Sequence, residues 1–442
     1  MAQISQTTAT TVSGQAAPPR AKDSLMAASV IGAHGIEHMY GRAFYVIIPD
    51  IRETLALSYF LTYLMDGTRS MSSGLSSMVS GFFTDIMQHR RVQILAISMF
   101  FVGIGYLLFA LSSIYVLMLL FLIVPSIGTA LWHPPALALL SQRFPLRRGL
   151  LVSLHRSFGN LGDVIAPLMV GAILAGGWML LGYEGWRWVL GAGAPLAFLL
   201  GILIFVALRN WGKGPPPKEA NFGRNTRAQF RSLREAFKGG GLRTILPIFI
   251  VSAVHGMGDR ALLTMIPIFI YDQINQGTFW IGSPESSRLW VGVHASLLSA
   301  GVIVVAPVFG ALSDRIGRKP LIVLVLVVAT VTSLAMAFSG GSVGFTLSVI
   351  AWGFFAFSVN SLTQASAMDL VSGKGLEGTF IGLMWGFNAF FGFATALSAG
   401  FLADNAGGEA VFYLAASLFF IGLLASLVMP GIKAVNRQAV ST

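Results

Sequence analysis

The 442-residue sequence contains no cysteine, and only 11% of its residues are charged. The missing cysteines exclude a disulfide framework, a thiolate metal site and a cysteine nucleophile. The low charge argues against a soluble protein, because soluble domains carry about 25% charged residues. The sequence also lacks a Gly-x-x-x-x-Gly-Lys-Ser phosphate-binding motif, which argues against ATP-driven pumping by this chain.

Apolar residues are abundant instead: 55% of the chain is hydrophobic and the mean hydropathy is +0.74. A membrane-spanning helix needs about 20 mostly apolar residues. Runs of this kind predict an all-α membrane protein with twelve transmembrane helices at residues 24–49, 55–83, 92–112, 115–140, 149–175, 188–208, 243–271, 289–312, 321–340, 343–368, 379–402 and 410–430. The run 55–83 fits least well, because it carries Asp66, Arg69 and many serines.

The basic residues predict the orientation of these helices. The tails and alternate loops hold 22 of the 29 Lys and Arg residues, whereas the other loops hold only Arg52, Arg187 and Arg288. Basic loops stay in the cytoplasm, so we expect both termini there, in a multi-pass protein of a bacterial inner membrane. The net charge of +11 then reflects topology and not a nucleic-acid partner.

The chain divides into two similar halves. Residues 1–23 are polar and lack the apolar core of a signal peptide, so we expect a disordered cytoplasmic tail there and a second tail at 431–442. A basic, proline-rich and glycine-rich linker at 209–242 separates residues 24–208 from residues 243–430. The segment 42–49, RAFYVIIP, matches 260–267, RALLTMIP. Related six-helix halves place a substrate site at their interface.

Two loops carry a motif that resembles the signature of the major facilitator superfamily. The more complete copy consists of Gly310, Asp314, Arg315, Gly317, Arg318 and Lys319, and the degraded copy of Gly81, Asp85, His89, Arg90 and Arg91. The resemblance implies twelve helices that work by alternating access. It also implies a gate in which the Asp of each loop pairs with an Arg across the cytoplasmic seam, and this pair breaks when the halves rock apart.

A narrower resemblance covers residues 80–172, which are similar to the fosmidomycin-resistance branch of proton-coupled drug exporters. It rests on His133, Pro134, Gly159, Asn160, Gly162 and Pro167, with His34 as a match to an early histidine. It implies that helices 115–140 and 149–175 are shaped by His133, Pro134, Gly162 and Pro167. Proton-coupled export follows as an expectation. Arg42, Arg69, Arg156 and Asp163 are charges that this branch does not lead us to expect.

Ionisable residues inside the membrane are costly and usually functional. His34, Glu37, His38, Arg42 and Tyr45 fall within about 140° of one helix face, and His255 and Asp259 align at i, i+4. Asn360 and Trp385 extend the polar lining. The candidates for proton coupling are His34, Glu37, His38, His255 and Asp259, and those for substrate binding are Arg42, Arg156, Asn160, Arg260, Gln364 and Asn388.

Two arginines, Arg42 and Arg260, occupy equivalent positions in the repeat. Organic-phosphate antiporters of the same superfamily place an arginine on each of these helices, and guanidinium binds carboxylate and phosphate bidentately. We therefore expect the two arginines to clamp an organic anion or an amphiphilic compound. In the alternative, acids on neighbouring helices neutralise both arginines.

Other functions compete with proton-coupled export. His34-x-x-Glu37-His38 has the spacing of an inverted zinc-protease motif, and this would suit a membrane metal-dependent hydrolase. The sequence shows no clear third ligand, so we expect no metal, no cofactor and no enzyme. Uptake or exchange of an anion without protons is a closer alternative. A non-transporting sensor would not need two gating loops. The expected partners are a small molecule, protons and the lipid bilayer, with the protein a monomer.

Overall fold

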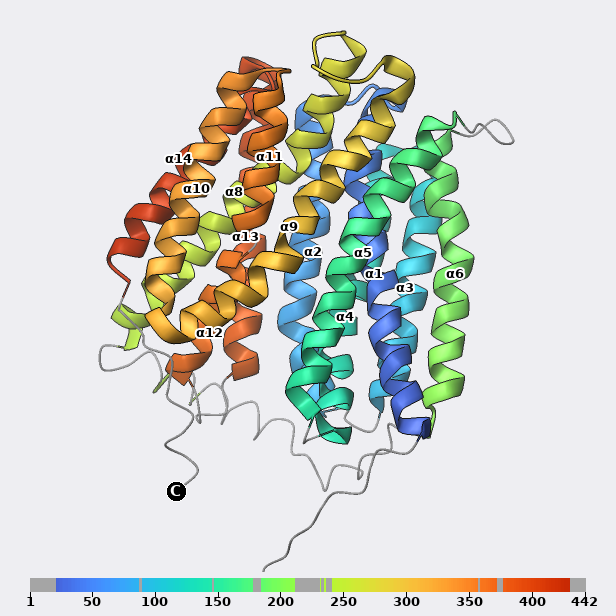
Figure 1. The fold of residues 1–442 in the computed structure, drawn as a ribbon. Helices are drawn as coiled ribbons and strands as arrows, with labels where there is room; N and C mark the ends of the chain where they lie inside the picture. Colours follow the sequence, from blue (N-terminus) through green and yellow to red (C-terminus); the bar gives the residue numbers. More distant parts are fainter. Residues whose placement is uncertain are drawn as a thin grey trace, which may run out of the picture.

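The computed structural model describes residues 21–86, 90–144, 147–177, 184–210, 231, 234–235, 241–356, 358–371 and 377–429. Within these residues the chain is helical and contains no strand (Figure 1). The helices are α1 (Ala21–Thr54), α2 (Tyr59–Ile86), α3 (Arg91–Leu111), α4 (Tyr115–Arg143), α5 (Arg148–Ala175), α6 (Gly185–Leu208), α8 (Gly241–Asn275), α9 (Ser287–Ile316), α10 (Arg318–Ser339), α11 (Val343–Phe355), α12 (Ser358–Val371), α13 (Glu377–Ala406) and α14 (Ala410–Leu427), with a 3₁₀ turn, η3 (Pro284–Ser286).

The helices form two bundles side by side (Figure 1). In the first half α3 packs on α4 and α6, and α1 packs on α5; in the second, α14 packs on α8 and α10. We call the end where α6 ends and α8 begins the linker side, and the end where α1 ends and α2 begins the far side. The tails 1–20 and 430–442 and most of the linker lie outside the described residues.

The prediction of twelve transmembrane helices in two six-helix halves is confirmed. In the described part of the chain, ten helical segments are long and apolar enough to cross a membrane by themselves, and α11 and α12 together form one of these. The other two helices, α1 and α2, are 34 and 28 residues long but carry several charged residues. They pack against α5 and α13, so protein and not lipid surrounds their charges.

One predicted helix, 343–368, is not continuous. The structure ends α11 at Phe355 and begins α12 at Ser358. Before this break α9 and α11 are in backbone contact, because a Cβ on Gly301 would lie 2.5 Å from Cα of Phe354. The predicted span is confirmed, but it consists of two helices, and a glycine and a serine near the break are common companions of helix kinks.

Glycines draw the two halves together at two equivalent seams. A Cβ on Gly171 of α5 would lie 2.7 Å from the Arg288 carbonyl oxygen of α9, and one on Gly400 of α13 would lie 2.6 Å from Cα of Phe60 on α2. Small residues at helix interfaces let backbones approach closely in membranes. Gly171 and Gly400 occupy matching places in the two halves, so the repeat seen in the sequence is also a repeat of the seams.

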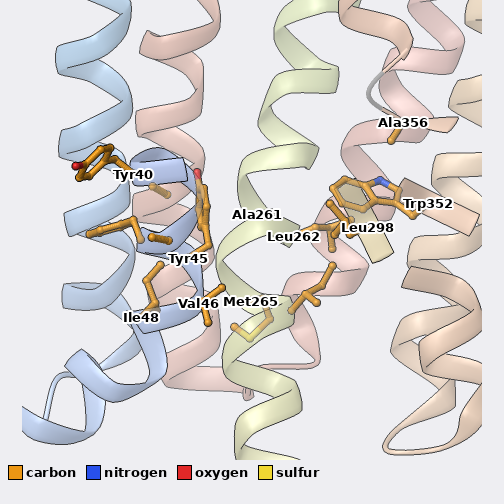
Figure 2. Close-up of a cluster of buried hydrophobic side chains, with 14 of the residues drawn as sticks. Tyr40, Tyr45, Val46, Ile48, Ala261, Leu262, Met265, Leu298, Trp352 and Ala356 are labelled. Carbon is orange, nitrogen blue, oxygen red and sulfur yellow. The ribbon is translucent and has the colours of Figure 1, made fainter. Parts of the chain in front are cut away.

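Apolar side chains fill the seams and cover the outside. Figure 2 shows one buried cluster, in which Tyr45 and Val46 lie on α1, Met265 on α8 and Trp352 on α11; all four are under 9% exposed. Many other large apolar residues are exposed, among them Leu111, Phe338, Leu347 and Phe401. Exposed apolar side chains on this scale suit a lipid solvent.

Candidate functional site

A polar cavity of about 330 Å³ lies between the two halves. Its walls come from α1, α2, α3 and α4 of the first half and from α8, α12 and α13 of the second. Of the predicted substrate residues, Arg260 and Asn388 line it, and so does Asp259 from the proton-coupling candidates. Asn388 donates from Nδ2 to Ser252 Oγ over 3.1 Å, which fixes its amide at the wall.

Hydroxyl groups make up much of the wall that the sequence reasoning missed. Ser70, Ser73 and Ser77 of α2 line the cavity together with Ser126 and Thr129 of α4. The serines of α2 follow the spacing of one helical face. In the sequence, these serines were only a reason why residues 55–83 fit a membrane span poorly. Their periodicity, i, i+3 and i+7, is the signal that marks them as a cavity wall.

A network around Asp66 joins the halves beside this cavity. Arg260 Nη1 lies 3.2 Å from each carboxylate oxygen of Asp66 and donates to Tyr45 Oη over 2.6 Å. Thr264 Oγ1 donates to the same carboxylate over 3.2 Å, and Arg69 Nε lies 3.8 Å from it. Asp66 is fully buried, so its charge depends on these partners.

Arg42 lies in a different environment from Arg260. Its Nε is 3.2 Å from Asp163 Oδ1, which His38 Nδ1 approaches to 3.0 Å. Arg42 lines a smaller pocket with Tyr45 and Pro167, whereas Arg69 and Arg260 line the main cavity. Both predicted clamp arginines are therefore ion-paired, as the alternative expected, and Arg69 is the arginine that shares the cavity with Arg260. The clamp of Arg42 and Arg260 stays a prediction.

His255 and Asp259 meet on α8 as their spacing predicts, with Nδ1 and Oδ2 3.2 Å apart. The imidazole is fully buried and the Asp259 side chain is 8% exposed. Among the described residues, Asp259 Oδ1 and both ring nitrogens of His255 are buried and have no hydrogen-bond partner. Asp259 is therefore an acid with one unsatisfied oxygen in a largely dry place, and the residue borders the cavity.

Four histidines gather around Glu37 in the first half. The rings of His34 and His155 stack with centroids 3.7 Å apart, and His133 of α4 lies edge-on to His34 at 4.9 Å. Donor atoms of His34, Glu37, His38 and His133 all lie within 4.8 Å of one another. The sequence showed no clear third ligand for His34 and His38, and the structure places His133 beside them as a third imidazole. His133 is 95 positions further on, and only helix packing brings it there.

Gly159 and Gly162 hold α1 against α5. A Cβ on Gly159 would lie 2.7 Å from His34 Nε2 and 3.0 Å from His38 Nε2. Gly162 contacts Gly35 backbone to backbone. These glycines of the resemblance therefore make room for the histidines of α1.

The remaining candidate residues lie on α4, α5 and α12, outside the lining of the main cavity. Pro134 removes the N–H that would bond the Ala130 carbonyl in a regular helix, and Ser80 Oγ donates to that carbonyl over 2.9 Å. Arg156 is exposed and Asn160 and Gln364 are half-buried. None of the three lines the main cavity described above.

Ion pairs close the seam on the far side, and the sequence reasoning did not identify them. Arg52 of α1 pairs with Asp272 of α8 at 3.2 Å. Arg288 of α9 pairs with Asp50 of α1 at 2.5 Å, and Tyr271 of α8 donates to Glu53. In the sequence, Arg52 and Arg288 entered only the count of basic loop residues that predicts the orientation of the helices. Each of these pairs joins residues that are more than 200 positions apart.

Removing Arg288 should loosen the far side. Loss of its contacts with Asp50 and Tyr271 should shift the population of far-side-open protein severalfold, because a partly exposed ion pair contributes about 1 kcal/mol at most. The natural chain has no cysteine, so Ser73→Cys in the cavity provides a single label site. Arg288→Ala should speed its reaction with an impermeant thiol reagent added from the far side.

Glu285→Gln is the matched control, since Glu285 is an exposed acid of η3 on the same side. It should leave the labelling rate unchanged. Equal labelling rates in Arg288→Ala and in its parent would show that these ion pairs do not hold the seam.

The linker side is different. Gly317 adopts φ +88° between α9 and α10, a conformation that favours glycine. Arg318 Nε bonds Asp369 Oδ2 at 2.8 Å within the second half.

Asp314 and Arg315 are exposed, and no ion pair reaches Asp314 from the part of the chain described. A Cβ on Gly310 would meet only open space. The surroundings of Gly81 and the side chain of Asp85 lie outside what the structure describes, and Arg90 is exposed. The latch across this seam stays a prediction.

Comparisons with known proteins agree with this architecture. The family model of the Major Facilitator Superfamily matches residues 30–396 and 248–440. The chain is 27% identical over 398 residues to an uncharacterized MFS-type transporter, YfnC, of Bacillus subtilis (strain 168), covering 89% of this chain and 91% of that one. It is 24% identical over 406 residues to the fosmidomycin resistance protein of Escherichia coli (strain K12), with the same coverage of 89% and 91%.

Solved structures share the fold. A bacterial homolog of the human lysosomal transporter Spinster, in an inward-facing and unoccupied conformation, superposes with a TM-score of 0.73 at 15% identity, over 93% of this chain and 98% of that one. The peptide transporter POT in complex with sulfate superposes with a TM-score of 0.70 at 16% identity, over 92% and 96%.

Proposed function

The chain belongs to the major facilitator superfamily, and from that premise we propose that it is a proton-coupled exporter of a small organic molecule that carries an acidic group. The observation that supports this most is the composition of the cavity between the halves. Two arginines, one aspartate and a wall of hydroxyls and amides line one space. Family membership favours transport over the hydrolase interpretation of the His34 to His38 motif.

The arginines of the cavity would bind the acidic group. Arg69 and Arg260 share Asp66 as a counter-ion, at 3.8 Å and 3.2 Å. A carboxylate or phosphonate of the substrate would accept charge-assisted hydrogen bonds from the two guanidinium groups. Because Arg69 lies on α2 and Arg260 on α8, such a substrate would contact both halves at once, as alternating access requires.

Asp259 would couple the substrate to protons. The Asp259 carboxylate lines the cavity and would accept a charge-assisted hydrogen bond from a hydroxyl, amide or ammonium group of the substrate, which is stronger than a neutral one. A proton on Asp259 removes this negative charge and weakens substrate binding, which gives exchange of one for the other. For an anion without such a donor, protonation of Asp259 would strengthen binding, because it removes a negative charge that repels the anion. Such an anion would then move together with the proton, as in the uptake alternative.

We place the linker side in the cytoplasm and regard this conformation as open toward it. The distribution of Lys and Arg residues supports the orientation, and the ion pairs on the far side support closure toward the outside. Reporter fusions at positions 180 and 225 should report opposite sides, with position 180 outside. Two fusions that report the same side would rule out this topology.

Sealed inverted vesicles test the function. With the linker side outward and the interior acidified, vesicles should accumulate a substrate that has both an acidic group and a donor, and collapse of the pH gradient should release it. A matched compound without the donor should not accumulate under these conditions. Accumulation that is indifferent to the gradient would overturn proton coupling, and accumulation under the reversed gradient would favour uptake. Proton transfer by His34, Glu37 and His38 remains a separate prediction.

A further inference from the structure

We infer that His34, Glu37, His38 and His133 form a binding site for one divalent transition-metal ion of the zinc class. The first three residues lie on consecutive turns of α1 and the fourth on α4. The site belongs wholly to the first half and lies beside the main cavity, not across the seam. This inference does not depend on the identity of the transported substrate.

The donor set suits such an ion. All four donor atoms lie within 4.8 Å of one another, with His34 Nδ1 3.7 Å and His38 Nε2 4.0 Å from Glu37 Oε2. Tetrahedral zinc with bonds of about 2.0–2.1 Å separates its ligand atoms by about 3.4 Å. Small side-chain rotations would close this difference. Three imidazoles select zinc, cobalt or nickel, whereas calcium and magnesium prefer oxygen ligands.

Two of the three histidines are already oriented as metal ligands. A ligating histidine usually donates its second ring N–H to a carboxylate or a backbone carbonyl. His38 Nδ1 contacts Asp163 Oδ1 at 3.0 Å, and His133 Nδ1 contacts the Thr129 carbonyl at 3.3 Å. Each contact, with Nδ1–H as donor, leaves Nε2 as the free lone pair. The Glu37 and Asp163 carboxylates would also offset the two charges of the ion.

The central atoms of the cluster have no other partner. His34 Nδ1 and Glu37 Oε2 are buried and have no hydrogen-bond partner in the part of the chain that the structure describes. His34 is 3% exposed and Glu37 is 2% exposed. A buried polar atom without a partner is costly. A bound cation would satisfy both atoms at once, whereas a hydrogen bond between them is not formed at 3.7 Å.

The cluster is also reachable. The His38 side chain is 26% exposed, and the His133 ring lies 6.2 Å from that of Trp385, which lines the cavity. An ion can therefore arrive through the cavity. Because α1 and α4 belong to one half, the bound ion would stabilise that half without blocking the rocking of the halves.

Titration of the purified full-length chain, without a histidine tag, with Co²⁺ tests the site. One equivalent should produce the visible absorption of four-coordinate cobalt, and Zn²⁺ should displace it. Glu37→Gln and His133→Gln should each weaken binding at least tenfold. Asp163→Asn, which acts through His38, should weaken it roughly tenfold. His294→Gln is the control, since His294 is a buried histidine of α9 that bonds Thr346 and the Trp290 carbonyl, and it should not change the affinity.

Wild-type protein that gives no such absorption would overturn the site without any variant, so a poorly folded variant cannot obscure the result. Equal loss of affinity in His294→Gln and His133→Gln would also overturn it, because the ion would then bind elsewhere or nonspecifically. Failure of substrate transport with intact Co²⁺ binding would leave the site standing and count only against the proposed function.

Discussion

Replacing Asp259 with asparagine should abolish accumulation of substrate driven by a pH gradient. The substitution removes the proton-binding carboxylate but keeps a carbonyl oxygen that can accept a hydrogen bond from the substrate. Exchange of external for internal substrate should therefore persist at a reduced rate. Vesicles with the variant should accumulate no more substrate under a pH gradient than without one, and this comparison is the measurement.

The control for this experiment is Glu285→Gln, which neutralises an exposed acid of η3 far from the cavity and should transport as wild type does. His255→Gln should reduce gradient-driven accumulation less than Asp259→Asn, because His255 contacts the carboxylate over 3.2 Å but does not line the cavity. Full accumulation by Asp259→Asn would place the coupled proton elsewhere, and the acids of the first half would be the next candidates.

The second large effect concerns Arg260. Arg260→Lys keeps the charge but loses the planar fork that binds an anion bidentately. Loss of one charge-assisted hydrogen bond costs about 1.5–3 kcal/mol, which weakens binding roughly tenfold to a hundredfold. Arg260→Ala should in addition destabilise the fold, because Asp66 is fully buried. Breaking a buried pair by removing one partner costs about 3–5 kcal/mol.

Substrate-dependent thermal stabilisation of purified protein measures both effects. The double variant Asp66→Asn, Arg260→Ala should regain thermal stability but not substrate binding, which separates the structural role of Arg260 from its binding role. Parallel measurements on Arg42→Lys and Arg69→Lys identify the second arginine of the site. We expect the larger loss at Arg69, which lines the cavity. A larger loss at Arg42 would support the pair predicted from the repeat. Unchanged affinity in all three lysine variants would make the arginines structural.

Much of the architecture could be predicted from local composition. A helix in lipid must satisfy its own backbone hydrogen bonds, so a run of about 20 apolar residues is sufficient to predict a span. Ten of the spans qualify on that basis alone. Pairs within one helix were also predictable, because 3.6 residues per turn brings i and i+4 together, as for His255 and Asp259. The match between segments 42–49 and 260–267 predicted the repeat of the two halves.

The partners of the functional side chains were decided by the tertiary structure. Asp66 meets Arg260 across 194 positions, and His133 joins His34 from another helix. Arg69 replaces Arg42 at the cavity, and Arg288 closes the far side against Asp50. A helical period states which residues share a face, but not how each helix is rotated or how close its neighbours approach. Those two quantities depend on packing at glycines such as Gly159, whose contacts come from helices that are distant in the chain.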